Sequence, residues 1–464
     1  MFDPLIYRQR REELVANLND GLLLLPGLAQ SPVNFSANPY PFRQDSSFLY
    51  YCGLNQPDMA LIIDIDHSRE TLCGPEPMPS DTIWSGPQPS LQANAAGCGI
   101  AHTGPSEIMG ETVRTATRAG RKIHYLPAYR PDQLLILSRL LGCSPDQVNA
   151  GCSEALVDTV IAQRSVKSSE EITEIETALG LCRKLFQALL EYRWKKSTGI
   201  ALAGFLEGIA KSRGSRFAFP PIITCRGDIL HNTPDNNPFP PSGLLLMDFG
   251  VESREHYTSD ITRTIPVSGR FTARQKAIYE IVLAAQKTVL ALAAPGVRFV
   301  DLHLRAATTL CEGLRDIGLI KGAVEDAVRV GAHALFYPHG LGHMLGLDVH
   351  DMEALGEDKV GYDRETARSD QFGLAFLRLG RRLENHFVVT IEPGIYFIPD
   401  LIDQWRQDPR WSSFIAFDKL DPYRGFGGVR IEDVICITAQ GCRGLGPVIP
   451  KAIATLEAAG LGGA

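Results

Sequence analysis

Residues 338–351 of the 464-residue chain read PHGLGHMLGLDVHD and gather three of its 11 histidines and two aspartates into fourteen positions. One proline and three glycines in this stretch favour a loop or a strand over a helix. Taken singly, each histidine has a plain structural reading, because histidines commonly make local hydrogen bonds. Several in one loop indicate a metal or substrate site. We expect His343, which lies between small residues, to be the metal ligand, with His339, His350 and the distant His231 as donors to a substrate.

A change in sequence character near residue 165 divides the chain. Single hydrophobic cores stop growing at about 250 to 300 residues, so 464 residues predict two domains. Residues 1–165 mix short strand-like runs with helical stretches and lack concentrated catalytic residue types. The stretch SVKSSEEITEIETALGLCRKLFQALLEY (165–192) then opens with a capping box, Ser168 and Glu171, and continues with apolar residues at helical spacing. This pattern predicts a long amphipathic helix that begins a second domain, 166–464.

The second domain contains a further predicted helix and three apolar strands. The helix follows the capping pair Thr272 and Gln275 and ends before Pro295. SGLLLMDFG (242–250) is typical of a buried strand, and FVVTIEPGIYF (387–397) and GGVRIEDVICIT (427–438) predict two more, each with a glutamate inside an apolar run. The poorly periodic segment 353–385 is predicted to lie at the surface or over the site.

Four acidic residues occupy positions where burial is expected: Asp248, Asp260, Glu392 and Glu432. One such acid is most often a strand end or the partner of an arginine. A buried cluster of four needs compensating positive charge, because each isolated carboxylate costs several kcal/mol to bury. Two divalent cations would supply it, and oxygen ligands with one imidazole and no thiolate suit Mn²⁺, Co²⁺ or Zn²⁺.

The composition excludes several other classes of partner. The net charge is -7 and no basic patch is visible, so we expect no nucleic-acid partner. No apolar run reaches the roughly 18 residues of a membrane span, and the charged, helix-like start does not resemble a signal peptide. The ten cysteines are scattered without a CxxC pair, which suits reduced thiols and predicts a cytoplasmic protein.

At five segments the chain resembles the Xaa-Pro peptidases of the pita-bread metallopeptidase group, which includes aminopeptidase P and prolidase. The segments are MDFG (247–250), SDITRT (259–264), HGLGHMLGLDVHD (339–351), TIEPGIYF (390–397) and GGVRIEDV (427–434). Residues 42–63, FRQDSSFLYYCGLNQPDMALII, are also similar to the amino-terminal domain of aminopeptidase P. The resemblance implies an α/β (α+β) fold, with a mixed α/β domain at 1–165 followed by a pita-bread catalytic domain at 166–464.

The resemblance also implies a ligand set for two divalent metal ions, with Mn²⁺ expected and Co²⁺ or Zn²⁺ as alternatives. Asp248 and Asp260 would bind one ion, and Asp260 would also reach the second. His343 and Glu392 would complete the ligand shell of the second ion, and Glu432 would bridge both ions. Glu392 would in addition move a proton during catalysis.

The remaining implied residues face the substrate. His231, His339 and His350 match the family's substrate-side histidines, Arg430 matches its supporting arginine, and Tyr257 is a candidate pocket residue. One departure is the spacing of the first two aspartates, which are twelve positions apart where the family usually has one fewer. We therefore expect a bulge or a longer turn in SREHYTS (253–259). The other departure is a longer segment between His350 and Glu392 than in compact members.

The expected activity is that of a metallo-aminopeptidase, a hydrolase that releases the N-terminal residue from peptides with proline in second position. An Xaa-Pro dipeptidase (prolidase) stays open as the alternative, because the motifs suit both. The N-terminal segment favours the aminopeptidase. A non-catalytic pita-bread binding protein is the remote alternative, disfavoured by the complete ligand set. The resemblance further predicts a homo-oligomer, a dimer or tetramer, with residues 1–165 at its interface.

Overall fold

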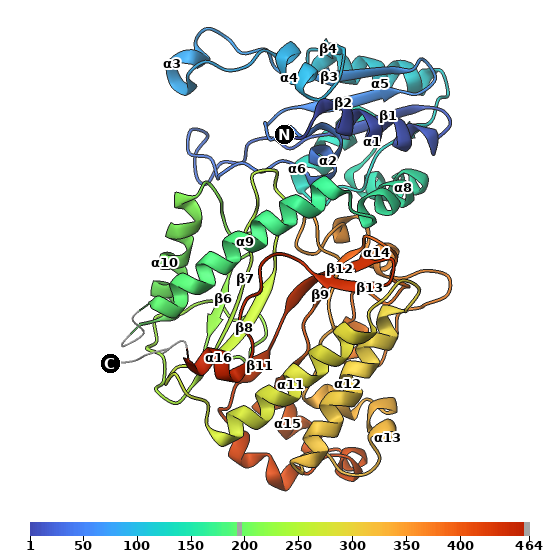
Figure 1. Cartoon of the computed structure of the whole chain (residues 1–464). Coiled ribbons are helices and arrows are strands. Elements are labelled where there is room, and N and C mark those ends of the chain that lie inside the picture. Colours follow the sequence, from blue (N-terminus) through green and yellow to red (C-terminus); the bar gives the residue numbers. More distant parts are fainter. Residues whose placement is uncertain (193–196, 459–464) are drawn as a thin grey trace. The chain divides into compact units, whose positions relative to one another are not determined.

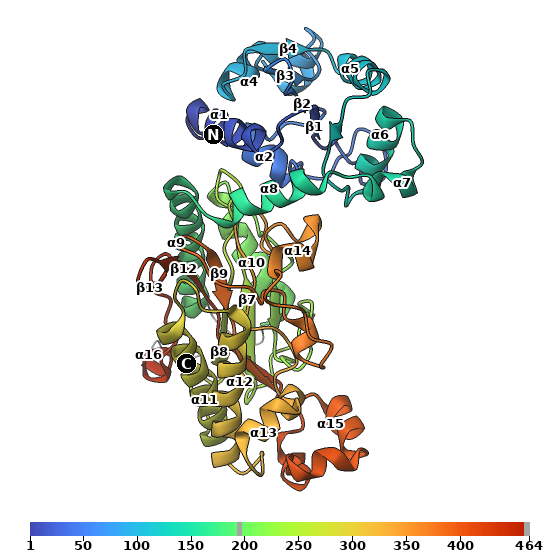
Figure 2. The same cartoon turned by 90° about the vertical axis from the view of Figure 1, so that its right-hand side faces the viewer.

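The computed structural model describes residues 1–192 and 197–458 and divides into two compact units. The first unit comprises Met1–Arg164 with Met352–Gly356, and the second comprises Ser165–Asp351 with Glu357–Ala464 (Figures 1 and 2). The predicted helix at the start of the second unit is confirmed as α9 (Ser169–Glu191). Its capping box is present, because the Ser168 side chain accepts from the Glu171 N–H and Glu171 Oε2 accepts from the Ser168 N–H.

The first unit is built on a mixed sheet that runs β4-β3-β2-β1-β5 among the described residues. β1–β2 and β2–β3 are antiparallel pairs, whereas β3–β4 and β1–β5 are parallel. The strands are β1 (Leu22–Pro26), β2 (Ala60–Asp64), β3 (Arg69–Cys73), β4 (His102–Gly104) and β5 (Ile123–His124). The helices are α1 (Pro4–Ala16), α2 (Ser46–Cys52), α3 (Asp81–Ser85), α4 (Leu91–Gly97), α5 (Glu107–Arg118), α6 (Pro131–Leu141), α7 (Pro145–Ala150) and α8 (Glu154–Ser165).

Three short antiparallel sheets form the centre of the second unit as far as the structure describes it. They run β6-β7-β8, β10-β11 and β13-β12-β9. The strands are β6 (Ile222–Thr224), β7 (Leu244–Phe249), β8 (Ile261–Pro266), β9 (Val388–Ile391), β10 (Gly394–Tyr396), β11 (Gly428–Arg430), β12 (Asp433–Thr438) and β13 (Gly441–Gly444). β8 is joined to β11 through the side chain of Thr264, which donates to Arg430 O and accepts from Arg430 N–H.

Helices pack against these sheets. α10 packs against α9 and β6, and α11 packs against α12 and contacts β9, β10, β11 and β13 (Figure 1). Besides α9, the helices are α10 (Gly199–Ser212), α11 (Ala273–Leu292), α12 (Phe299–Asp316), α13 (Val324–Arg329), α14 (Glu357–Gly361), α15 (Pro399–Arg406) and α16 (Ile453–Ala458). Short 3₁₀ turns of this unit are η1 (Ala332–Leu335), η3 (Leu374–Phe376), η4 (Pro409–Ser413), η5 (Phe417–Lys419) and η6 (Asp421–Tyr423), whereas η2 (Glu353–Leu355) belongs to the first unit.

The predicted strands at 387–397 and 427–438 were wrong in one respect, because each is broken at its glutamate. The β9–β12 ladder ends at the pair Ile391 and Asp433, and the β10–β11 ladder begins at Gly394 and Arg430. Between them Pro393 has no N–H to donate to a ladder. The N–H groups of both glutamates donate outside the two ladders, that of Glu392 to Leu341 O and that of Glu432 to Thr262 O.

The turn between the first two aspartates lies between β7 and β8. β7 ends at Phe249 and β8 begins only at Ile261. In between, Ser253 N–H donates to Tyr257 O, and His256 adopts a positive φ of 66°. Residues 253–257 thus form a tight turn between β7, which carries Asp248, and Asp260, which directly precedes β8.

Candidate metal centre

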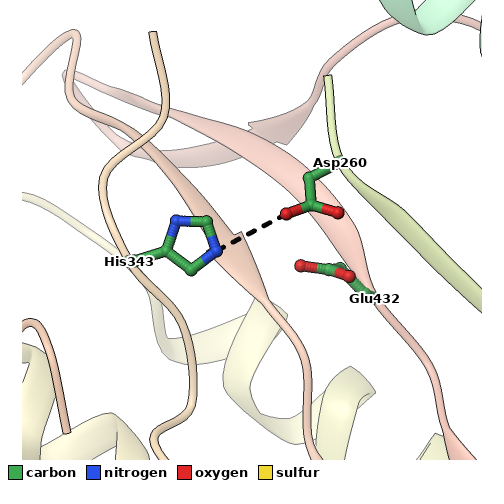
Figure 3. A group of neighbouring side chains, drawn as sticks. All are labelled: Asp260, His343 and Glu432. Atoms are coloured by element: carbon green, nitrogen blue, oxygen red, sulfur yellow. Dashed lines mark ion pairs between the residues drawn. The ribbon is translucent and has the colours of Figure 1, made fainter. Parts of the chain in front are cut away.

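The five predicted ligands come from five separate segments and converge. Asp248 lies in β7, Asp260 precedes β8, and the two glutamates occupy the strand breaks. His343 comes from the loop quoted above. Ligand atoms of Asp260, His343 and Glu432 all lie within 4.8 Å of one another, and their side chains point toward one another in Figure 3.

His343 is held in the orientation that a metal ligand needs. Its Nδ1 lies 2.9 Å from Met344 O, so Nδ1–H donates to that carbonyl and the Nε2 lone pair is left exposed to the site. Nε2 lies 3.6 Å from Asp260 Oδ2 and 3.7 Å from Glu392 Oε1. The loop approaches β9 so closely that a Cβ on Gly342 would come within 2.0 Å of Thr390 O, which only glycine permits.

The carboxylates of the cluster are incompletely paired. Asp248 Oδ2 accepts from Arg430 Nη2 at 2.7 Å, and Glu432 Oε2 accepts from Thr262 Oγ1 at 2.7 Å. The Oδ1 atoms of Asp248 and Asp260 are buried and have no hydrogen-bond donor among the described residues. A buried oxygen without a donor costs about 1 to 3 kcal/mol, so these two atoms point to a cation that is not part of the protein chain.

The electrostatics lead to the same conclusion. Burial raises the pKa of Asp260 well above its usual range, and the charges of Asp248 and Glu392 raise it further. Burial likewise raises the pKa of Glu432 well above its usual range, with Asp260 and Glu392 adding to the effect. For Glu392 burial again raises the pKa, although His343 and Arg430 oppose it. The buried Arg430 and the more exposed Arg378 do not offset four carboxylates, and the residues present therefore fit divalent cations.

A cavity of about 1070 Å³ opens beside this cluster within the second unit. His231, His339 and His350 all line it, and the His350 ring centroid lies 4.1 Å from that of His343. Apolar walls are supplied by Phe219, Pro220, Pro221, Ile222, Leu230, Ile398 and Leu401. Phe372, Phe376 and Arg378 from the 353–385 segment also line the cavity, so this part of the segment lies at the site, which was one of the two locations predicted for the segment.

His339 differs from the other two cavity histidines. Its Nδ1 lies 2.8 Å from Gly340 O and its Nε2 lies 2.9 Å from Tyr396 Oη. Burial and the nearby Arg430 lower the pKa of His339 to about 3, so the ring is neutral and Nδ1 carries its proton. Nε2 then accepts from the Tyr396 hydroxyl. In this structure His339 has no free donor for a substrate, in contrast to the donor role expected from the sequence.

Tyr396 was missed by the sequence reasoning, although it lies in the quoted segment TIEPGIYF. Its hydroxyl accepts from Arg430 Nη1 at 2.9 Å and joins His339 to the arginine that holds Asp248. A tyrosine in an apolar strand carries no local signal of such a role. Its two partners lie 57 and 34 positions away in the sequence.

The prediction that Tyr257 lines the pocket was wrong. Tyr257 is 2% exposed, and its hydroxyl donates to Glu171 Oε1 at 3.0 Å. Of the described residues, those that line the cavity do not include it. The turn in residues 253–259 directs the ring toward α9, because the Tyr257 backbone is tied to Ser253 through N–H···O bonds in both directions.

Comparison with known proteins identifies the family. The model of metallopeptidase family M24 matches residues 173–439. The chain belongs to metallopeptidase family M24. The model of the aminopeptidase P N-terminal domain matches residues 7–124. This M24 protein is therefore placed among the hydrolases, and the family predicted from the five segments is confirmed.

Relatives and solved structures extend the match to nearly the whole chain. A probable Xaa-Pro aminopeptidase of Metarhizium acridum is 30% identical, over 94% of this chain and 89% of that protein. Proline aminopeptidase P II from Yersinia pestis superposes with a TM-score of 0.81 and 28% identity, covering 99% of both chains. A zinc-substituted Escherichia coli aminopeptidase P in complex with product superposes with a TM-score of 0.79 and 26% identity, covering 99% of this chain and 98% of that one. The predicted mixed α/β fold with a pita-bread catalytic domain is thereby confirmed.

Within residues 1–192 and 197–458, no helix combines the length and the hydropathy needed to cross a membrane.

Proposed function

We propose that this M24 protein is a dinuclear-metal Xaa-Pro aminopeptidase, which releases the N-terminal residue from peptides with proline in second position. The observation that carries the proposal is the convergence of five ligand side chains beside an apolar cavity. The names of the relatives and of the superposed structures support the choice of substrate. We assign the chemistry to residues 166–464.

In the proposed site Asp248 and Asp260 would hold one cation, and His343 and Glu392 would hold the second. Asp260 and Glu432 would contribute oxygen ligands to both. The orphaned Oδ1 atoms of Asp248 and Asp260 support this arrangement, since each would gain a positive partner. Mn²⁺ is the expected metal, with Co²⁺ or Zn²⁺ as alternatives, because the donors are oxygens with one imidazole.

Divalent cations at this position would lower the pKa of water and polarise the scissile carbonyl. The chain's own residues have separate tasks. Glu392 takes up the proton of the attacking water and passes it on to the leaving amine. His350 and His231, which line the cavity, donate hydrogen bonds to the oxygen on which negative charge develops. Arg430 fixes the Asp248 carboxylate, and we now give His339 a positioning role through Tyr396.

The cavity walls suit a proline-containing substrate. Proline has no amide N–H, so a site for it relies on shape and apolar contact and needs no acceptor for that group. Phe219, Ile222, Leu230, Ile398 and Leu401 provide such contact. Apolar pockets with a few placed polar groups are the common form of a small-ligand site.

An Xaa-Pro dipeptidase is the second candidate, and Arg378 is the observation that favours it. This arginine lines the cavity and lies close enough to His231 and Glu392 to influence their pKa. Its Nη1 pairs with Glu357 at 2.8 Å, and its side chain is 34% exposed. A guanidinium in this position could bind the free carboxylate of a dipeptide, which a longer peptide carries farther from the metals.

Peptide length should distinguish the two candidates. For an aminopeptidase we expect Xaa-Pro-Yaa to be cleaved at least about tenfold faster than Xaa-Pro, and Arg378→Ala to leave tripeptide cleavage within about twofold. For a dipeptidase we expect the reverse preference. Arg378→Ala should then raise the KM for Xaa-Pro by about 10- to 100-fold, because the substrate carboxylate loses a charged hydrogen bond. The measurement is kcat and KM for both substrates on one metal-loaded preparation.

Glu357→Gln is the matched control for Arg378. It removes the ion-pair partner of Arg378 but leaves the guanidinium beside the cavity. If Glu357→Gln changes the length preference as much as Arg378→Ala does, Arg378 acts through the local fold and does not bind a carboxylate. Failure of the wild-type protein to cleave any Xaa-Pro bond under metal-loaded conditions would contradict both candidates.

We also propose a homo-oligomer, a dimer or tetramer, with residues 1–165 at its interface. Support comes from large apolar side chains on the first unit: Met78, Ile83 and Trp84 are 62%, 79% and 87% exposed. Ile83 and Trp84 belong to α3, at the end of an extended segment of that unit (Figure 1). Exposed apolar patches of this kind commonly mark protein interfaces. A cytoplasmic location fits the ten cysteines, all of which are free thiols.

Light scattering tests the assembly. The wild-type protein should show two or four times the chain mass of 50.8 kDa at micromolar concentration. Trp84→Ser should shift the distribution toward smaller species, because it removes the most exposed large apolar side chain of α3. A monomer mass for the wild-type protein would contradict the proposal. Leu292→Ser, which removes a 47% exposed leucine from the second unit, is the control.

A further inference from the structure

The two strand breaks that carry Glu392 and Glu432 lie against one helix. α11 contacts β9 and β10, which flank the break at Glu392, and β11, which precedes the break at Glu432 (Figure 1). Gln286 is the residue of α11 that reaches both breaks, and it is fully buried. Its neighbours on the buried face, Val282 and Val289, are apolar. The sequence therefore places an isolated polar side chain on the core side of a helix, where it needs partners.

Gln286 donates to the carbonyl that immediately precedes each glutamate. Its Nε2 lies 3.2 Å from Ile391 O and 3.1 Å from Ile431 O. Its Oε1 accepts from Lys451 Nζ at 2.8 Å. Because the lysine ammonium can only donate, this contact fixes the amide with its nitrogen toward the two carbonyls. Both N–H groups of one amide are thus used on the two glutamate-bearing segments.

These contacts hold the peptide planes from which the glutamates project. Ile391 O and the Glu392 N–H belong to one planar peptide unit, as do Ile431 O and the Glu432 N–H. The N–H end of the Ile391–Glu392 peptide group is also held, since the Glu392 N–H donates to Leu341 O at 2.8 Å. The Glu432 N–H donates to Thr262 O at 3.1 Å. Each peptide plane is therefore fixed at both ends, and Gln286 is common to the two.

Charged neighbours hold this arrangement in place. Lys451 also pairs with Asp433, which in turn accepts from Arg263 Nη2 at 2.6 Å. Arg263 Nη1 donates to Glu432 O at 2.6 Å. The carbonyls on both sides of the Glu432 Cα thus have side-chain donors. Asp433 thus pairs with both Lys451 and Arg263, and these ion pairs fix the lysine that orients the Gln286 amide.

We propose that Gln286 is a positioning residue that sets the relative orientation of Glu392 and Glu432 toward the metals. The inference rests on the proposed ligand roles of these two glutamates. Metal sites need their ligands held to within about 0.5 Å, and loss of an outer contact of this type typically costs about 10- to 100-fold in metal affinity or activity. A contact that serves two ligands at once should have an effect within that range.

Gln286→Met tests the inference, since methionine has nearly the same length but no donor. We expect apparent metal affinity to fall by about 10- to 100-fold, measured by metal titration of the chelated protein. The rise in Tm when metal is added should shrink accordingly. At saturating metal kcat should fall while KM changes little, because the cavity walls that bind substrate are unaltered.

Tyr279→Phe is the matched control on the same helix. The Tyr279 hydroxyl is buried and donates to a backbone carbonyl, Lys451 O, at 2.8 Å, but this carbonyl does not precede a glutamate of the site. The Tyr279→Phe variant should lower the Tm of the metal-free protein and leave both the metal affinity and the metal-induced rise in Tm unchanged. Gln286→Glu is a second variant that keeps the shape and the contact with Lys451 while removing the two amide donors.

Two results would overturn the inference. One is that Gln286→Met and Gln286→Glu retain wild-type metal affinity and kcat. The other is that Tyr279→Phe reduces the metal affinity as much as they do, which would make the effect a general loss of stability. If the wild-type protein itself takes up no divalent metal, the proposed function fails. That result is separate from the others, because it is measured before any variant is made.

Discussion

Chelation of divalent cations should abolish peptide hydrolysis by this M24 protein and lower its melting temperature, and Mn²⁺ or Co²⁺ should restore both. The physical reason is the buried cluster of Asp248, Asp260, Glu392 and Glu432, which has Arg430 as its principal positive partner among the described side chains. A ligand that binds only the folded state stabilises it by about 2.7 kcal/mol at 100 times its Kd. The measurements are an activity assay and a thermal melt before and after chelation.

The same electrostatics give the metal-free protein a distinctive pH dependence. Burial raises the pKa of Asp260, Glu392 and Glu432 above the ordinary carboxyl values of about 4. A carboxyl group with a higher pKa in the folded than in the unfolded chain favours folding while it is protonated. Its contribution is complete below the ordinary pKa and is lost as the pH rises through the folded pKa.

The Tm of the chelated protein should therefore fall as the pH rises above the ordinary carboxyl pKa of about 4 and through the raised pKa values of the folded state. Metal binding strengthens over the same interval, because the ligands must lose their protons to bind. The difference in Tm between metal-loaded and chelated protein should thus widen with pH. A constant difference, or active protein without bound transition metal by elemental analysis, would contradict the two-metal proposal.

Replacing His343 and His350 separately by alanine should produce two different defects. His343 Nε2 faces Asp260 and Glu392, so His343→Ala should lower metal occupancy and activity together. His350 lines the cavity beside it, so His350→Ala should leave the metals bound and reduce kcat by about 10²-fold or more, or about 3 kcal/mol. A donor to the developing oxyanion acts mainly in the transition state, and KM should change little.

Metal content, kcat and Tm measured on both variants separate these outcomes. His339→Ala serves as the third member of the series. The ring has a proposed positioning role through Tyr396, so this variant should keep its metals and show a smaller loss of activity than His350→Ala. If His350→Ala loses the metals while His343→Ala keeps them, the ligand and the donor have been exchanged. The proposed ligand set would then be wrong.

The sequence alone was sufficient to predict the parts of this protein that depend on local chemistry. Capping boxes at Ser168 and Thr272 located the starts of α9 and α11, because their partners lie three residues away. Acidic residues within apolar runs identified candidate ligands, because burying a carboxylate costs free energy in any fold and requires a positive partner. Segment order then identified the family, which the M24 match confirms.

Tertiary structure decided everything that depends on partners distant in the sequence. The strands break at Glu392 and Glu432 because the two N–H groups find acceptors in Leu341 and Thr262, far along the chain. Both ring nitrogens of His339 are hydrogen-bonded, because Nδ1 donates to Gly340 O and Nε2 accepts from the Tyr396 hydroxyl. Gln286 has its role because the two carbonyls it contacts lie 105 and 145 positions away. A hydrogen bond depends on direction and on distances of about 3 Å, and only the folded chain brings these atoms within that range.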